Sequence, residues 1–286
     1  FEPTAVLRAV ERERCTALYG VPTMFIAELG LADFDSFDLS SLRTGVMAGS
    51  PCPVEVMKQC VDRMNMRDVT ICYGMTETSP VSTQTLPDDS LHHRTATVGR
   101  AHPHVEVRIA DPDTGATVER GTTGEFCTRG YSVMQGYWNE PDKTAAAIDA
   151  DGWMHTGDLA TMTDDGYCNI VGRIKDLVIR GGENIYPREV EEFLYTHPDI
   201  EDVQAIGVPD EKYGEELMVW VKLRPGASLT DDALREFCRG KIAHFKVPRY
   251  VKFVDEFPMT VTGKVRKVEM REISTAELGL SPTATA

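Results

Sequence analysis

Residues 1–75 alternate between helical and extended patterns, and this alternation limits the possible fold more than any other feature. Pro3 and Pro22 each begin a helical pattern, where proline fits because the first helical N–H needs no partner. Residues 53–66 carry apolar side chains at helical spacing. The short apolar segments TALYG, TGVMAG and DVTICYG between the helices are typical of strands. The alternation predicts an α/β part with a mainly parallel sheet covered by helices.

The pattern changes twice further along the chain, which predicts four parts. Short extended segments separated by turns such as DPDTG and TDDGY predict a small antiparallel, barrel-like sheet. Strands and helices then mix in a compact α+β domain, in which Pro187 and Thr230 mark helix starts. The predicted boundaries are 1–97 for the α/β part, 98–174 for the barrel-like sheet, 175–274 for the α+β domain, and 275–286 for a disordered tail.

Composition excludes several classes of protein. The net charge of −15 argues against a partner that is nucleic acid or an anionic membrane surface. No apolar run reaches the roughly 20 residues that a membrane span needs. The seven cysteines show no C-x-x-C spacing, which favours reduced thiols in the cytoplasm, or in an organelle matrix if the source is eukaryotic. Whether the chain forms a homo-oligomer stays open.

The segment ERGTTGEFC, residues 119–127, raises the question of a phosphate-binding loop. Its two glycines would let backbone N–H groups approach an anion, and its threonines offer hydroxyl groups. However, Glu125, Phe126 and Cys127 follow the second glycine and begin an extended pattern. We therefore interpret the segment as a turn that enters the small sheet.

Two motifs follow predicted strands of the α/β part, where open α/β sheets bind ligands. In YGMTETSP, Tyr73 offers a flat ring, Thr76 a hydroxyl, and Glu77 a carboxylate suited to Mg²⁺ beside a polyphosphate. In MAGSP, small residues from Met47 to Pro51 would let a planar base lie against the backbone. The alternative for the first motif is a polar turn capped by its own threonine and glutamate.

Three further motifs lie downstream. WMHTGDLA ends in a carboxylate, Asp158, that could accept both hydroxyls of a ribose. GRIKDLVIRGGENIYP contains Arg173, suited to phosphate or sugar oxygens, and the pair Gly181 and Gly182, which would let a narrow ligand approach. PMTVTGKVRK places Lys264 after a flexible turn, where it could neutralise developing negative charge. Taken singly, each of these motifs more often has a structural role than a ligand-binding role.

Taken together and in this order, the motifs resemble the adenylate-forming enzymes, and specifically the AMP-forming acyl-CoA synthetases. The resemblance extends from YGVPTMF to TGKVRK and is closest to the medium- and long-chain fatty-acid branch. It implies a large AMP-binding domain, a hinge and a mobile C-terminal domain. It also implies that ATP and a carboxylic acid form an acyl-adenylate, which coenzyme A then converts to a thioester, with Mg²⁺ as the metal.

The resemblance also implies roles for individual residues. Lys264, Thr76 and Glu77 would be catalytic, and Glu77 would also bind Mg²⁺. Lys175 would be the hinge residue. The expected coenzyme A contacts are Gly181, Gly182 and Glu183. The expected ATP and AMP contacts are Gly49, Ser50, Pro51, Tyr73, Gly74, Met75, Asp158 and Arg173.

One departure from the family pattern leaves alternatives open. The family's Thr/Ser- and Gly-rich phosphate loop is absent, and the chain starts at Phe1 without a methionine. We therefore expect a C-terminal half whose N-terminal part is missing and which lacks full activity alone. The alternatives are an aryl- or other acid-CoA ligase, a domain that loads a carrier protein, or a non-catalytic fragment with residual nucleotide binding.

Overall fold

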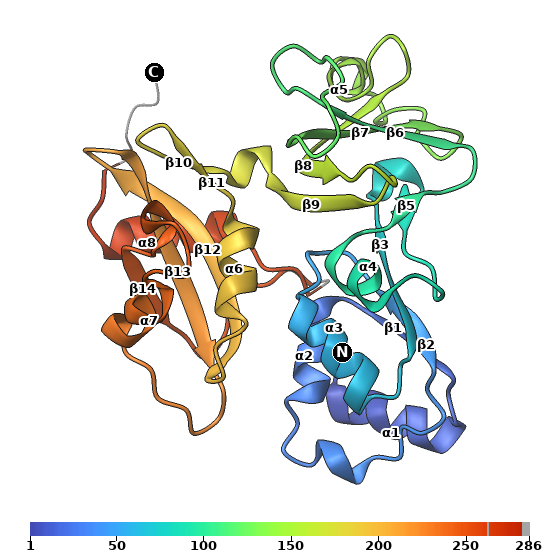
Figure 1. The fold of residues 1–286 in the computed structure, drawn as a ribbon, viewed down its shortest axis with the longest axis vertical. Helices are drawn as coiled ribbons and strands as arrows, with labels where there is room; N and C mark the ends of the chain where they lie inside the picture. Colours follow the sequence, from blue (N-terminus) through green and yellow to red (C-terminus); the bar gives the residue numbers. More distant parts are fainter. Residues whose placement is uncertain (262, 282–286) are drawn as a thin grey trace. The chain divides into compact units, whose positions relative to one another are not determined.

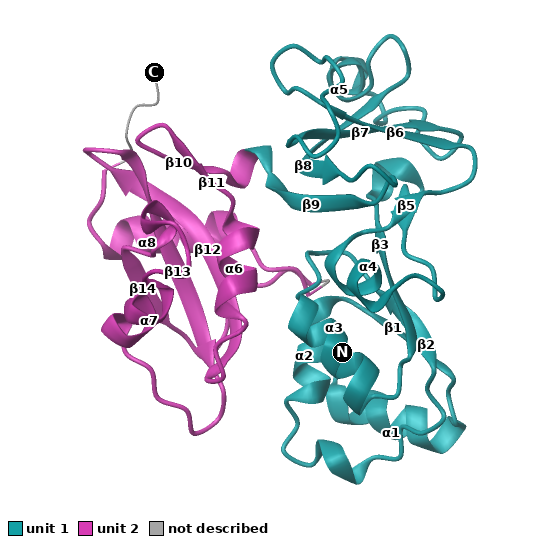
Figure 2. Cartoon of the chain, in the orientation of Figure 1, with its two compact units in different colours: residues 1–174 teal, residues 175–286 magenta. Residues whose placement is uncertain are grey.

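The chain folds into two compact units. A computed structural model describes residues 1–261 and 263–281. Unit 1 comprises Phe1–Ile174 and unit 2 comprises Lys175–Ala286 (Figure 2). None of the helices in the described ranges is both long enough and apolar enough to cross a membrane.

Unit 1 begins with a five-stranded sheet whose strand order follows the chain (Figure 1). β1, β2 and β3 are parallel, and β4 and β5 are antiparallel to their neighbours. Parallel neighbours need a long crossover connection, which helices provide here. The α/β part predicted from the alternating pattern is therefore confirmed. The strands are β1 (Ala17–Gly20), β2 (Thr44–Met47), β3 (Asp68–Tyr73), β4 (Thr83–Gln84) and β5 (Arg100–Ala101).

The first three helices of this part each bury apolar residues on one side. Pro3 and Pro22 lie in the first turns of their helices, as predicted. Met57 of the third helix is fully buried and shares a hydrophobic core with Met47 and Ile71 of the sheet. The elements are α1 (Pro3–Glu13), α2 (Pro22–Leu29), α3 (Val54–Arg63) and α4 (Leu91–Ala96), with the 3₁₀ turns η1 (Phe34–Ser36) and η2 (Thr76–Thr78).

A second, antiparallel sheet completes unit 1, which confirms the antiparallel prediction. Its strands follow the order β6-β7-β8-β9 in an open sheet, accompanied by a short helix. Phe126 and Cys168 of this sheet belong to the same hydrophobic core as Met47 of the first sheet. The two sheets therefore share one core. The elements are β6 (Val105–Ala110), β7 (Gly124–Gly130), α5 (Pro141–Ala147), β8 (Met154–Met162) and β9 (Cys168–Arg173).

Unit 2 is an α+β domain around a sheet of order β11-β10-β13-β12, with β14 parallel to β13. Pro187 begins a helix, and the Thr230 side chain caps another by accepting a bond from the Ala233 N–H, as predicted. Its elements are η3 (Ile174–Asp176), which crosses the unit boundary, β10 (Val178–Arg180), β11 (Glu183–Ile185), α6 (Pro187–Leu194), β12 (Ile200–Asp210), β13 (Gly214–Leu223), α7 (Asp231–Cys238), η4 (His244–Lys246), β14 (Tyr250–Phe253) and α8 (Lys267–Glu277).

The long strands of unit 2 bury both of their faces. Val219 and Val221 of β13 lie in one hydrophobic cluster with Leu194 of α6. Met218 and Trp220, the alternating residues, lie in a second cluster with Met270 of α8. Because successive strand side chains point to opposite faces, the continuous apolar run MVWV fills both clusters.

The prediction of a disordered tail at 275–286 is wrong for the first residues of that range. Helix α8 continues to Glu277, and Leu280 packs against the second cluster. The reason is a tertiary contact, because the Trp220 Nε1–H donates to the buried Ser274 Oγ at 2.9 Å and holds the helix on the sheet. Residues 282–286 lie outside the described residues.

Glu28 of α2 generates a prediction about pH and stability. Its side chain is 2% exposed, and its Oε2 has no hydrogen-bond partner among the described residues. Burial raises the pKa of this carboxyl to about 8. In the unfolded chain a glutamate carboxyl has a pKa of roughly 4.3. At pH values between the unfolded and folded pKa, Glu28 is therefore protonated in the folded state and ionised in the unfolded state.

Stability should therefore fall as pH rises from about 5 to about 8, by up to roughly 1.4 kcal/mol per pH unit. Glu28→Gln should remove this slope, whereas Glu119→Gln, at an exposed position of the same unit, should retain it. Urea unfolding at several pH values measures the slope. Identical slopes for the wild type and Glu28→Gln would contradict the assignment.

Candidate functional site

The carboxyl ends of β2 and β3 carry two of the predicted motifs side by side. Met47 pairs with Ile71 in the parallel register, so the segments after both strands leave the sheet at one edge. Gly49, Ser50 and Pro51 follow β2, and Gly49 has φ +90°, a conformation that suits glycine. The structure thus brings the first predicted segment beside the second.

Gly74 lies where another part of the backbone passes very close. A Cβ atom at this position would come 1.9 Å from the carbonyl oxygen of Pro80. The following turn, η2, is held by the buried Thr78, whose Oγ1 accepts a hydrogen bond from the Met75 N–H at 3.0 Å. This rigid turn leaves Thr76 exposed and fixes the backbone of the predicted catalytic pair.

Tyr73, Asp158 and Arg173 form a cluster across the two sheets of unit 1. The Tyr73 hydroxyl donates to Asp158 Oδ2 at 2.7 Å, and Arg173 Nε donates to Asp158 Oδ1 at 3.1 Å. Asp158 and Arg173 are cross-strand partners in β8 and β9. The Asp158 side chain is 12% exposed and that of Arg173 is 68% exposed. Burial and then the Asp158 charge raise the pKa of Tyr73, so its hydroxyl stays a donor.

Glu77 has a partner that the sequence analysis did not identify. The Tyr137 hydroxyl donates to Glu77 Oε1 at 2.8 Å, and the Met134 N–H donates to the Glu77 carbonyl at 2.8 Å. The hydrogen bond to Glu77 is the main cause that raises the pKa of Tyr137. The sequence offered one signal for this contact, the adjacent aromatic residues Tyr137 and Trp138. Both are exposed in the structure.

Glu125, Cys127 and His155 bring three types of metal ligand within 4.8 Å of one another. However, His155 Nδ1 lies 2.7 Å from Glu125 Oε2, which is a hydrogen-bond distance. Burial and then the Glu125 charge raise the pKa of the Cys127 thiol to about 12. Because Glu125 and His155 already bond to each other, and Glu125 Oε1 also accepts from the Gly157 N–H, we interpret the three residues as a structural cluster.

In unit 2, the predicted glycine pair forms a tight hairpin. Gly181 and Gly182 connect β10 to β11 with φ values of +58° and +88°, as a two-residue turn with positive φ requires. A Cβ on Gly181 would lie 2.9 Å from the Tyr213 ring. Glu183 is exposed at the start of β11, and Lys175 is exposed at the start of unit 2.

Lys264 lies at the end of a turn in unit 2. The Thr260 N–H donates to the Lys264 carbonyl at 2.7 Å, and the Lys264 N–H donates to Thr260 Oγ1 at 3.0 Å. The side chain is exposed, and its ammonium group forms no ion pair with any residue that the structure describes. These contacts fix the backbone and leave the charge on a solvated side chain.

Comparisons with known proteins identify the family. The sequence model of the "AMP-binding enzyme" family matches residues 1–138, and that of the "AMP-binding enzyme C-terminal domain" matches residues 189–264. The chain belongs to the AMP-binding enzyme family. Curated relatives named acyl-CoA synthetase and acyl-CoA ligase match this chain, which confirms the resemblance stated from the motifs.

Two curated relatives of this AMP-binding enzyme chain are close. It is 59% identical to the putative acyl-CoA synthetase YngI of Bacillus subtilis, over 98% of this chain and 51% of the relative. It is 46% identical to the human mitochondrial medium-chain acyl-CoA ligase ACSF2, over 98% of this chain and 46% of the relative. The chain spans about half the length of the curated relatives it matches.

Solved structures of the family confirm the predicted fold. The anthranilate CoA ligase AuaEII, in complex with anthranoyl-AMP, matches with a TM-score of 0.89 and 30% identity, over 97% of this chain and 53% of that chain. ATP-bound MatB from Rhodopseudomonas palustris matches with a TM-score of 0.87 and 32% identity, over 97% of this chain and 54% of the MatB chain. The chain therefore has the adenylate-forming fold over the part that it covers.

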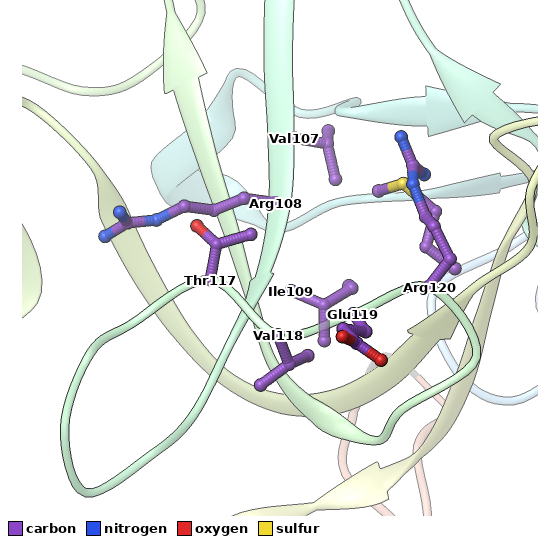
Figure 3. A pocket seen from close by; sticks show the side chains of 8 residues that line it. Val107, Arg108, Ile109, Thr117, Val118, Glu119 and Arg120 are labelled. Atoms are coloured by element: carbon purple, nitrogen blue, oxygen red, sulfur yellow. The ribbon is translucent and has the colours of Figure 1, made fainter.

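A small pocket of this AMP-binding enzyme chain is lined by none of the predicted site residues. Its volume is about 80 Å³, well below the roughly 300 Å³ of typical small-molecule sites. Figure 3 shows Val107, Arg108, Ile109, Thr117, Val118, Glu119 and Arg120 around it, and Met162 completes the lining. None of these residues is in a predicted motif with a ligand role, so the pocket is not a candidate active site.

The Tyr73–Asp158–Arg173 cluster gives a prediction about stability. Tyr73→Phe removes a donor from a buried carboxylate, which should lower the free energy of unfolding by about 1–3 kcal/mol. Tyr137→Phe removes a donor from the less buried Glu77 and should cost less than about 1 kcal/mol. Urea unfolding of both variants measures the two losses of unfolding free energy. Equal losses would show that the burial of Asp158 does not increase the cost of removing its donor.

Proposed function

We propose that this chain carries the nucleotide site and the mobile lysine of an ATP-dependent fatty-acyl-CoA synthetase. The Tyr73–Asp158–Arg173 cluster, at the strand edge that also carries the Gly49–Pro51 segment, is the observation on which the proposal rests. In this reaction the acid's carboxylate attacks the α-phosphorus of ATP and pyrophosphate leaves. The thiol of coenzyme A then attacks the acyl carbon, giving the thioester and releasing AMP.

Nucleotide binding follows from the chemistry of the cluster. Each carboxylate oxygen accepts more than one hydrogen bond, so Asp158 could hold the two ribose hydroxyls while Tyr73 and Arg173 fix its orientation. The adenine base would lie against Gly49, Ser50 and Pro51 and against the backbone of Gly74 and Met75. The close approach of Gly74 to the Pro80 carbonyl requires glycine at this position and fixes the backbone against which the base would lie.

Magnesium fits the residues of the η2 turn. The Glu77 carboxylate is an oxygen ligand of the hard type that Mg²⁺ prefers, and the exposed Thr76 precedes it in the turn. When bound, Mg²⁺ supplies positive charge beside the polyphosphate. Glu77 would hold the ion, Tyr137 would keep its carboxylate oriented, and Thr76 would donate a hydrogen bond to a phosphate oxygen.

The residues of unit 2 would serve both halves of the proposed reaction. Lys264 would neutralise the charge that develops at the α-phosphate during adenylation. Rotation at Lys175 would then remove Lys264 and bring Gly181, Gly182 and Glu183 to the pantetheine arm of coenzyme A. The exposed Lys264 ammonium and the hairpin of two glycines support these roles.

For the acid, we propose a medium-chain fatty acid. Curated relatives with 46–49% identity bear the name medium-chain acyl-CoA ligase. The apolar helix α2 and the segment after β2 would provide one wall for an aliphatic chain. The aryl alternative has weaker support, because the anthranilate ligase is 30% identical. By composition and by these relatives, we propose the cytoplasm or an organelle matrix as the compartment.

ATP–pyrophosphate exchange on this 286-residue chain tests the proposal, with acids from acetate to palmitate and with benzoate. Because the family's phosphate loop is absent from this sequence, we expect little exchange from this chain alone. A chain extended to the length of its relatives should show exchange that depends on the acid and is greatest for medium chains. AMP binding without exchange, in this chain and in one extended to the length of its relatives, would favour the non-catalytic alternative. Exchange with benzoate alone would favour the aryl alternative.

Lys264→Ala separates the two half-reactions. In a chain extended to the length of its relatives, we expect acid-dependent exchange to fall by a factor of about 10² or more, because the charge stabilising the adenylation transition state is lost. Thioester formation from pre-made acyl-adenylate should be largely retained. Lys241→Ala, an exposed lysine of the same unit, is the matched control and should retain both steps. Equal loss of both steps in Lys264→Ala would contradict the two-conformation account.

A further inference from the structure

Glu125 of β7 is a buried carboxylate for which the proposed reaction has no use. Glu125 is 8% exposed, and both of its carboxylate oxygens have hydrogen-bond partners. Oε1 accepts a hydrogen bond from the Gly157 N–H at 2.9 Å, and Oε2 lies 2.7 Å from His155 Nδ1. Burying a carboxylate is costly unless hydrogen bonds replace its hydration, so these two contacts explain how Glu125 remains inside.

The bond to Gly157 replaces a missing contact in the sheet. Glu125 pairs with Leu159, but Cys127 pairs with His155, so one residue of β7 faces three residues of β8. These three, 156–158, form a bulge, and the β7–β8 ladder does not pair the Gly157 N–H. The Glu125 side chain supplies the acceptor that the ladder lacks.

The bulge determines where Asp158 points. Gly157 has φ +71° and a Cβ there would meet no atom within 4 Å, so its requirement for glycine is conformational. The next residue is Asp158. Within the bulge, the Thr156 Oγ1 accepts from the Asp158 N–H at 3.2 Å and donates to the Phe126 carbonyl at 2.7 Å.

His155 connects Glu125 to a second acidic group. Its Nε2 lies 3.5 Å from Asp149 Oδ2, and Arg108 also reaches Asp149 at 3.4 Å. Asp149 in turn accepts the Trp153 N–H at 2.8 Å. The ring of His155 is thereby held between two carboxylates, which restrains the Glu125 side chain against rotation.

We propose that Glu125 is a positioning residue for nucleotide binding, which holds the Gly157 turn so that the Asp158 carboxylate faces the ribose. This inference rests on the proposed function, because it assigns Asp158 to the ribose hydroxyls. Glu125 does not touch the nucleotide. It acts through the hydrogen bond to Gly157.

The test compares AMP with 2′,3′-dideoxy-AMP, which lacks the two ribose hydroxyls, by calorimetry on the full chain. The wild type should prefer AMP by roughly tenfold or more, as expected for hydrogen bonds to a charged group. Glu125→Ala should lose most of this preference while its affinity for the dideoxy nucleotide stays unchanged. Glu125→Gln should keep most of it, because its amide oxygen still accepts the Gly157 N–H.

Glu106→Ala is the matched control, since Glu106 is an exposed glutamate on neighbouring β6 that pairs with Arg129. It should keep the preference for AMP. An equal loss of affinity for both nucleotides in Glu125→Ala would indicate general destabilisation and overturn the positioning role, as would an unchanged preference.

Amide hydrogen exchange distinguishes failure of this inference from failure of the proposed function. Glu125→Ala should lower protection of the Gly157 amide at least tenfold, because that amide loses its acceptor, while Glu106→Ala should not. Unchanged protection would overturn the inference by itself. A wild-type chain that does not distinguish AMP from the dideoxy nucleotide, but shows the exchange effect, would overturn the ribose assignment and leave Glu125 as a residue that only holds the turn.

Discussion

The buried Asp158 carboxylate is the constraint on which the architecture of unit 1 depends. Removing a carboxylate from water costs several kcal/mol unless donors replace the solvent. Tyr73 comes from the last position of β3, and Arg173 from the last position of β9. The same charge therefore fixes the two sheets of unit 1 against each other, above a hydrophobic core that they share.

Arg173 also links this cluster to the division of the chain. It is the last residue of β9, and the unit boundary follows one residue later, between Ile174 and Lys175. Arg173 binds Asp158 through Nε and remains largely exposed, so the proposed ligand-binding charge lies beside the boundary. In the proposed reaction, this position would suit a change of domain arrangement between the two steps.

Local patterns predicted much of the fold and singled out Tyr73, Asp158 and Arg173, which the structure brings together. Prolines at helix starts, the Thr230 cap and the alternating strand segments gave the element types, because these depend on neighbours in the chain. The tail was mispredicted because Ser274 and Leu280 are ordered by contacts with a distant strand and cluster. Tyr137 and Glu125 were missed for the same reason, since their partners Glu77 and Gly157 lie far away in sequence.

The sequence by itself determined the alternating elements, the order of the motifs and the chemical groups available to a nucleotide. Only the tertiary structure decided which of those groups meet, because pairing of Tyr73 with Asp158 spans 85 residues and pairing of Glu77 with Tyr137 spans 60. Local propensity carries no information about such contacts. They form when the sheets pack, since burial of a polar group makes its hydrogen-bond partners obligatory.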